Sequence, residues 1–205
     1  MIKIINIAVL GSTKGTDLQA VIDAVESKEL DAEIKIVISN KENAYILVRA
    51  ESHDIKTLLI SQKGKTREEF DREVMEALEK EKIDLVLLIG YMRILSKEFV
   101  EKWGLRTMNV HPSLLPKFAG GMDTNVHEEV LKAGEKESGM TIHFISERAD
   151  DGPIIIQKRC RIDPDETIET LKEKVQKLEG KGFVEAIKLF AEGRIKVEGG
   201  KVIIR

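Results

Sequence analysis

Short runs of apolar residues alternate along this chain with segments in which apolar residues recur at helical spacing. Phe70, Val74 and Leu78 show the helical spacing, and Asp84 to Ile89 (DLVLLI) is the most apolar of the runs. Parallel strands need a crossover connection, and a helix is the usual one. The alternation therefore predicts βαβ units around a mostly parallel sheet, with the DLVLLI strand at its centre.

The same reading places each element along the chain. Strands are expected at 4–10, 34–39, 55–60, 84–89, 106–111, 141–146 and 153–162. Helices are expected at 16–27, from 43, at 66–80 with Thr66 as N-cap, near 97, at 125–132 and from 167. Residues 194–205 (RIKVEGGKVIIR) predict a short terminal hairpin. Because no repeat, low-complexity segment or linker interrupts the pattern, residues 1–205 are expected to form a single domain.

Composition excludes several classes of protein. A chain of 205 residues can bury about 70% of its unfolded surface without a metal or disulfide. The 33 Lys and Arg against 36 Asp and Glu leave a net charge of −3 and no basic stripe, so no nucleic-acid partner is expected. The single Cys160 and the lack of zinc spacing indicate a reducing compartment and no metal site. No signal peptide or membrane span is recognised, so a cytoplasmic protein is expected.

A turn of small residues, GSTKGTDL at 11–18, follows the first expected strand. Backbone N–H groups at such a junction can point at an anion, which the dipole of the following helix also favours. The spacing is neither GxxxxGK[ST] nor GxGxxG, so neither a nucleoside triphosphate nor a dinucleotide is indicated. The alternative is a tight connection capped by Thr16 or Asp17. The carboxylate of Asp17 would repel a phosphate, and both interpretations stay open.

The stretch NVHPSLLP contains Asn109 and His111. Side chains alternate along a strand, so these two are expected on one face, and Pro112 ends the strand because it lacks an N–H donor. They would lie at the carboxyl end of a strand, where open α/β sheets form ligand crevices. Asn can donate to a developing oxyanion, and His can move a proton near neutral pH. The pair can equally satisfy a buried turn.

A third polar stretch, RADDGP at 148–153, lies between two expected strands. A Gly-Pro turn after paired acids fixes a loop that could hold one of the two carboxylates against His111. A carboxylate in that place would raise the pKa of the imidazole and orient it. An acidic surface hairpin is the alternative.

In combination, these stretches resemble the 10-formyltetrahydrofolate-dependent formyltransferases. The order is the small-residue turn with DLQ, then GYMRILS, NVHPSLLP and DDGPIIIQ with a closing helix, from the first strand to about Arg194. NxHPSLLP is specific to that superfamily, and its combination with the turn and the DxGP loop is similar to the branch that acts on glycinamide ribonucleotide. The resemblance implies a Rossmann-like α/β fold of three layers, with a mostly parallel central sheet, helices on both faces and a short C-terminal hairpin.

The resemblance also implies roles for single residues. The three catalytic positions correspond to Asn109, His111 and Asp150. The turn that binds the acceptor's phosphate corresponds to Gly15, Thr16 and Asp17, and contacts with the ribonucleotide correspond to Arg67 and Glu179. The folate pocket corresponds to Met92, Arg93, Ile94 and Leu95, and the loop around the pterin to Glu147, Arg148, Ala149 and Asp150. His143 is expected behind the site, whereas His127 and His53 match no family position and are expected to face solvent.

Three features depart from the family pattern. Asp17 stands where Asn is usual, which bears on binding of the acceptor's phosphate. The segment at 119–125 (AGGMDTN) is a few residues longer than in the shortest members, on one side of the folate entrance. Gly180 follows Glu179 where a His is common.

The resemblance implies acyl transfer from 10-formyltetrahydrofolate, as co-substrate, to the amine of glycinamide ribonucleotide in purine synthesis. Alternatives are a transferase of the same family acting on another small amine, and a formyl-folate hydrolase. A methionyl-tRNA formyltransferase is similar at NxHPSLLP but carries a further C-terminal domain and needs a basic surface. The intact Asn109, His111 and Asp150 set argues against a binding module without catalysis. The expected partners are small molecules, with no nucleic acid or membrane, and the protein is expected to be a monomer or homodimer.

Overall fold

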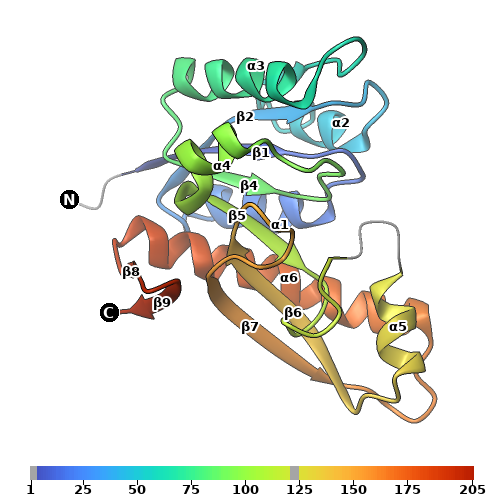
Figure 1. Cartoon of the computed structure of the whole chain (residues 1–205). Helices are drawn as coiled ribbons and strands as arrows, with labels where there is room; N and C mark the ends of the chain where they lie inside the picture. Colours follow the sequence, from blue (N-terminus) through green and yellow to red (C-terminus); the bar gives the residue numbers. More distant parts are fainter. Residues whose placement is uncertain (1–3, 121–124) are drawn as a thin grey trace.

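The computed structural model describes residues 4–120 and 125–205, which contain a seven-stranded sheet (Figure 1). The strands lie in the order β3-β2-β1-β4-β5-β6-β7. In chain order they are β1 Ile5–Leu10, β2 Ala32–Ser39, β3 Thr57–Leu59, β4 Leu85–Leu88, β5 Thr107–His111, β6 Glu137–Phe144 and β7 Ile154–Arg161. The pairs from β3 to β5 are parallel, whereas β6 and β7 add in antiparallel fashion. The mostly parallel sheet and the central place of β4 are confirmed.

Helices cover both faces of this sheet, which confirms the three layers. They are α1 Thr16–Glu26, α2 Tyr45–Glu51, α3 Arg67–Lys80, α4 Lys97–Trp103, α5 Val126–Lys132 and α6 Ile168–Ala191, with a short 3-10 helix at Gly104–Arg106. One core joins α3 and α4 to the sheet through Phe70, Phe99 and Trp103, all buried. A second core joins α1, α2, α5 and α6 to the other face, where α6 runs along β6 and β7 (Figure 1). The predicted terminal hairpin is β8 Ile195–Glu198 paired with β9 Lys201–Ile204.

Local signals placed several element ends correctly. Thr66 caps α3 in a reciprocal capping box: its Oγ1 accepts from the Glu69 backbone N–H (3.1 Å), and the Glu69 carboxylate accepts from the Thr66 N–H (2.8 Å). The start of β6 was predicted wrongly, because the strand begins at Glu137 rather than at Thr141. Its first residues are not an apolar run, and pairing with β7 from Glu137 opposite Arg161 makes them a strand.

The topology brings three connections to one edge of the sheet. Neighbouring parallel strands β1, β4 and β5 end at the same side, so the turn after β1, the loop after β4 and the end of β5 meet there. Residues 121–124, part of the longer segment at 119–125, lie outside the described residues. Among the residues that are described, no helix combines the length and the apolar character needed to span a membrane.

Candidate active site

A His and an Asp face each other at the end of β5. His111 is 4% exposed, and its Nδ1 lies 3.2 Å from Asp150 Oδ2. The backbone N–H of Gly120 donates to the same carboxylate oxygen at 2.9 Å. His143 Nε2 lies 3.6 Å from Asp150 Oδ1. The structure therefore brings the predicted Asp150, and not its neighbour Asp151, against His111, and the acidic-hairpin alternative does not apply to Asp150.

The pairing of β5 with β6 places Asn109 next to these residues. Asn109 on β5 lies opposite His143 on β6, and Asn109 Nδ2 is 3.2 Å from His143 Nε2. The other ring nitrogen of His143 lies 2.8 Å from the carbonyl oxygen of Phe144 and donates to it. That hydrogen bond leaves Nε2 of a neutral His143 to accept from the Asn109 amide. His143 thus orients Asn109 from the neighbouring strand, and it also lines one of the two cavities described below.

Asp150 has an unusual backbone conformation, and its neighbours keep its carboxylate ionised. Its φ is 56°, a left-handed conformation that Asp tolerates better than most residues. Burial alone would raise the pKa of Asp150. The contact with His111, the nearby ring of His143 and the hydrogen bond from the Gly120 backbone outweigh burial and hold that pKa well below its usual range. At neutral pH the carboxylate is therefore charged and can orient the imidazole of His111.

The second ring nitrogen of His111 is available to a ligand. Nε2 is buried and has no hydrogen-bond partner within the described residues. A buried polar nitrogen without a partner costs free energy, which a substrate atom or water placed there would recover. Among the described residues, the Asn109 amide uses one of its two N–H donors toward His143, so the other remains for a second substrate atom.

One cavity, here called the turn cavity, opens beside His111. Its volume is about 450 Å³, within the range of small-molecule sites. It is lined by the turn at 13–17, the end of β5 at 110–112, the start of α5 at 125–127, by Ile89, Gly90 and Met92 after β4, and by Lys172, Gln176 and Glu179 of α6. The predicted residues Gly15, Thr16, Asp17 and Glu179 therefore meet at one cavity, although Glu179 lies far from the turn in sequence.

Gly15 gives the turn its shape. Its φ is 66°, and a Cβ added to it would lie 2.4 Å from the Ile46 side chain, so a larger residue would not fit. Gly15 is the N-cap of α1, and no side chain in the described part of the chain caps this helix, so the alternative of a Thr16 or Asp17 cap is wrong. The first N–H groups of α1 are left without a capping side chain, as binding of an anion requires.

A second cavity, here called the loop cavity, lies on the other side of the cluster. Its lining includes Arg93, Ile94, Leu95, Glu147, Arg148, Ala149 and Asp150, as predicted, together with Asn109, His143 and Tyr91. Met92 departs from the prediction, because it lines the turn cavity instead. The backbone N–H of Met92 donates to the buried hydroxyl of Ser12 (3.1 Å), which in turn donates to Asn40 (2.6 Å). These hydrogen bonds, which hold the start of the loop at 91–95, gave no signal in the sequence.

Side chains of α3 contact the loop at 91–95 and the residue that follows it. The guanidinium of Arg93 lies over the Phe70 ring at 4.0 Å. The carboxylate of Asp71, fully buried, accepts from the Ser96 backbone N–H at 2.5 Å. Burial raises the pKa of Asp71, and the hydrogen bonds from Ser96 and the charges of Arg93 and Arg67 act in the opposite direction.

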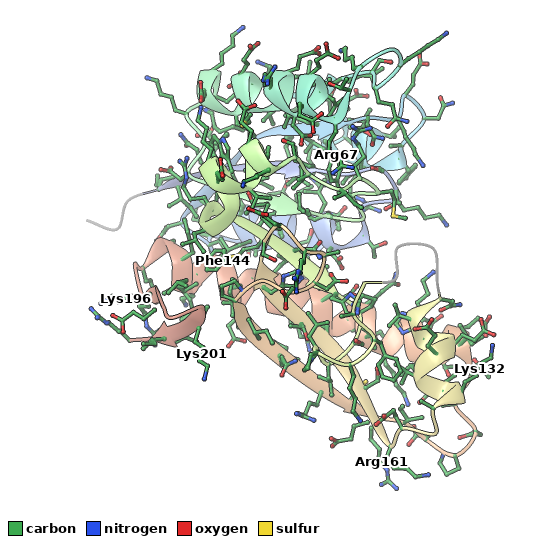
Figure 2. The ribbon with its side chains drawn as sticks, in the orientation of Figure 1. Arg67, Lys132, Phe144, Arg161, Lys196 and Lys201 are labelled. Atoms are coloured by element: carbon green, nitrogen blue, oxygen red, sulfur yellow. The ribbon has the colours of Figure 1, made fainter. Side chains whose placement is uncertain are left out.

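Three other residues differ from expectation or lie elsewhere. Arg67 begins α3, is exposed and lines neither cavity, so its contact with a ribonucleotide stays a prediction (Figure 2). His127 was predicted to face solvent, but it is 8% exposed and lines the turn cavity, because α5 packs its first turn toward α6. His53 is half-buried, with its Nδ1 2.7 Å from Glu26.

The model of the formyl transferase family matches residues 5–187. The chain belongs to this family. It is 38% identical over 193 residues to the phosphoribosylglycinamide formyltransferase of Haemophilus influenzae, covering 94% of this chain and 90% of that protein. The resemblance stated from the motifs is thereby confirmed, and the roles of the single site residues stay predictions.

Solved structures of formyl transferases share this fold. Glycinamide ribonucleotide transformylase 1 of Symbiobacterium toebii is 36% identical with a TM-score of 0.93, over 98% of this chain and 94% of that one. A phosphoribosylglycinamide formyltransferase of Coxiella burnetii is 40% identical, also with a TM-score of 0.93, over the same shares. Some relatives are much longer: the human trifunctional purine biosynthetic protein adenosine-3 is 43% identical over 96% of this chain, which spans 19% of that protein.

Within the described residues, no group of three or more His, Cys, Asp or Glu side chains is arranged to hold a metal ion. The residues suited to hold an organic co-substrate are those of the loop cavity, with its apolar Ile94 and Leu95 and its polar loop at 147–150.

Proposed function

We propose that the chain transfers the formyl group of 10-formyltetrahydrofolate to the amine of glycinamide ribonucleotide. The observation that carries this proposal is that Asn109, His111 and Asp150 lie together at the junction of the two cavities. His111 lines the turn cavity, whereas Asn109 and Asp150 line the loop cavity, and His111 and Asp150 lie 3.2 Å apart. Group transfer between two bound molecules needs such a junction, because the reacting atoms must meet in one place.

Each cavity suits one substrate. The turn cavity offers uncapped N–H groups at the start of α1 and the cations Lys14 and Lys172 for a phosphate, with Glu179 for sugar hydroxyl groups. The loop cavity offers Ile94, Leu95 and the backbone of the 147–150 loop to a flat heterocycle with several hydrogen-bonding edges. The acceptor therefore binds on the side of His111, and the folate on the side of Asn109.

The reaction proceeds by addition and elimination at the formyl carbon. The acceptor amine attacks that carbon, the new C–N bond forms, and the carbonyl oxygen becomes an oxyanion. The free N–H of Asn109 donates to this oxyanion, and the imidazolium form of His111, held by Asp150, stabilises it electrostatically. The attacking amine loses a proton with the help of Asp150 through water. The bond between the formyl carbon and N10 breaks, and N10 takes up a proton.

The proposal is tested by following release of deformylated folate from 10-formyltetrahydrofolate, with and without glycinamide ribonucleotide. The wild-type protein is expected to release it only with the acceptor. Asp150→Asn is expected to lose activity by about 100-fold or more, because the imidazolium loses its counter-charge. The matched control Asp151→Asn changes an exposed carboxylate next to it and should keep the wild-type rate.

Two results would overturn the assignment. Release that does not need any acceptor would make the protein a hydrolase, and release only with another amine would keep the chemistry but discard the ribonucleotide. Full activity in Asn109→Ala or Asp150→Asn would contradict the catalytic roles of these side chains.

The proposal includes the domain organisation, the partners and the cellular compartment that were expected from the sequence. A single formyltransferase domain at 1–205 acts on small-molecule substrates in the cytoplasm, without a metal. Cys160, a free half-buried thiol, fits a reducing compartment. Whether the protein is a monomer or a homodimer stays a prediction, which its mass in solution would decide.

A further inference from the structure

Pairing with a neighbouring strand holds His111 on one side. The parallel pairing of β5 with β4 ends at Asn109, which lies opposite Leu88. Beyond that point, the strand partner of β5 within the described residues is β6, where His111 lies opposite Thr141. Pro112, which has no N–H to donate, follows directly. The position of His111 therefore depends on β6 and on the segment after Pro112.

Three side chains form a row across β5, β6 and β7. His111 lies opposite Thr141, and Thr141 lies opposite Gln157. Cross-strand partners point to the same face of a sheet, with their Cβ atoms about 5 Å apart. Thr141 is fully buried and Gln157 is half-buried. The row therefore places a hydroxyl, and next to it an amide, beside the imidazole.

The loop after His111 is buried, so its backbone groups need partners. Ser113 is 1% exposed and Leu115 is 5% exposed. Thr141 Oγ1 donates to the Ser113 carbonyl oxygen (2.7 Å) and accepts from the Leu115 N–H (3.1 Å). The Gln157 amide donates to the Leu115 carbonyl oxygen (2.9 Å) and to Thr141 Oγ1 (2.9 Å). Because a buried backbone group without a partner costs free energy, these two side chains, here called the loop anchor, fix the path of the loop.

The loop anchor is fully hydrogen-bonded. A hydroxyl has one donor and two acceptor positions, and the amide nitrogen of Gln157 has two donors. The four hydrogen bonds use all of them. A buried polar network in which these groups are satisfied specifies one arrangement, and removal of one member leaves the others unpaired.

The anchored loop leads to a second contact of Asp150. It begins after His111 and reaches Gly120, whose N–H donates to Asp150 Oδ2 at 2.9 Å. The same oxygen lies 3.2 Å from His111 Nδ1. Within the loop, Ser113 Oγ donates to the Lys117 carbonyl oxygen (2.9 Å). The loop anchor therefore holds the segment that joins two groups in contact with one carboxylate oxygen.

We propose that Thr141 and Gln157 are positioning residues for His111, and that through the loop after it they fix its imidazole against Asp150. Neither side chain belongs to the lining of the turn cavity or of the loop cavity. Their loss should therefore lower the rate of formyl transfer and leave substrate binding nearly unchanged. This effect on rate rests on the proposed function, whereas the effect on the contact between His111 and Asp150 does not.

That contact can be measured without any substrate. In ¹⁵N-labelled protein, the Nδ1–H of His111 is followed by NMR, because a hydrogen bond to a carboxylate shifts its signal downfield and slows its exchange with water. Thr141→Val removes the hydroxyl at nearly constant size, and the downfield signal should be lost. Thr141→Ser keeps the hydroxyl and should keep the signal. An unchanged signal in Thr141→Val would refute the positioning role.

Steady-state kinetics with 10-formyltetrahydrofolate and glycinamide ribonucleotide measure the consequence for catalysis. Thr141→Val should lower kcat by about 100-fold with nearly unchanged KM values, because a displacement of about 1 Å at a reacting group has that effect. Thr141→Ser should restore most of the rate. Thr107→Val is the matched control. Thr107 is fully buried at the start of β5 and donates to the Trp103 carbonyl oxygen (3.0 Å), so its substitution removes a similar hydrogen bond far from the loop and should keep kcat. An equal fall of kcat in both Val variants, or a loss through KM alone, would refute the proposal.

A double variant tests whether the two side chains act through one loop. Gln157→Met keeps the length of the side chain and removes both donors, so it should also lower kcat and weaken the His111 signal. Combined with Thr141→Val, it should be little worse than the more severe single variant, because residues of one network are not additive. Rate losses that multiply would contradict a shared anchor. Gln157→Met also provides the test if Thr141→Val does not fold.

The proposed function and the positioning role can fail separately. If the wild-type protein releases no deformylated folate with this acceptor, the proposed function is wrong, and the NMR signal of His111 still decides the positioning role. If the wild type is active and Thr141→Val keeps both the signal and kcat, the positioning role is wrong and the proposed function stands.

Discussion

Gly152 holds the loop that carries Asp150, and replacing it by Ala should impair stability and catalysis together. A Cβ at this position would lie 1.7 Å from the carbonyl oxygen of Phe144. Phe144 is the last residue of β6 (Figure 2). Since real Cβ contacts stay beyond 3.0 Å, the two segments must separate by about 1.3 Å. The neighbour is backbone and cannot rotate away. The hydrogen bond from the Phe144 N–H to the Pro153 carbonyl (2.9 Å) lies in the same connection and would be strained.

The expected cost of Gly152→Ala follows from these contacts. Overpacking of this kind costs about 1–3 kcal/mol, and a displacement of about 1 Å at a reacting group can cost about 100-fold in rate. Asp150 lies two residues before Gly152 and would move away from His111. We therefore expect a lower urea midpoint with an unchanged m-value, and a fall in kcat measured on folded protein.

Gly104→Ala is the matched control for this substitution. A Cβ there would make ordinary contacts at 3.4 and 3.5 Å, and the backbone φ of −52° suits Ala. Its stability should stay within about 1 kcal/mol of wild type, with full activity. If Gly152→Ala behaves like this control, the position of Asp150 does not depend on the close contact with Phe144.

Three further predictions concern stability and substrate binding. Thr66→Ala removes the capping box of α3 and should cost about 1 kcal/mol in urea unfolding, and an unchanged midpoint would contradict the cap. Asp71→Ala leaves the Ser96 backbone N–H buried and unpaired, so the substitution should cost about 1–3 kcal/mol of stability and raise KM for the folate. An unchanged KM would show that the loop cavity does not depend on Asp71. The fold raises the pKa values of Asp17 and Glu179, so their contribution to the free energy of unfolding should be complete below about pH 4. That contribution should be lost as pH rises through 7 to 8. Unfolding at several pH values should therefore show Asp17→Asn gaining about 2–4 kcal/mol on the wild type at high pH, and parallel profiles would contradict the raised pKa values.

Local patterns in the sequence determined most of the fold. The apolar runs and the helical spacing marked every strand of the sheet and every α-helix, because burial on one face requires that periodicity wherever the element lies. Thr66 and the Asn109–His111 pair were recognisable for the same reason: a cap or a strand's alternation involves residues a few positions apart. The start of β6 was predicted wrongly, because its first residues are defined by pairing with β7 and not by their own character.

Which residues belong to the site depended on packing between segments that are distant in sequence. Asp150 reaches His111 only through the antiparallel β6–β7 connection, and Glu179 reaches the turn only through the crossing of α6 with α1. For the same reason His127 proved to be buried, and Met92 lies on the other side of its loop from the place that was predicted. The sequence by itself determined which side chains are able to do chemistry and on which elements they stand. Only the tertiary structure decided which of them share a cavity and which carboxyl groups are kept from water, because burial and proximity are properties of segments that meet after folding.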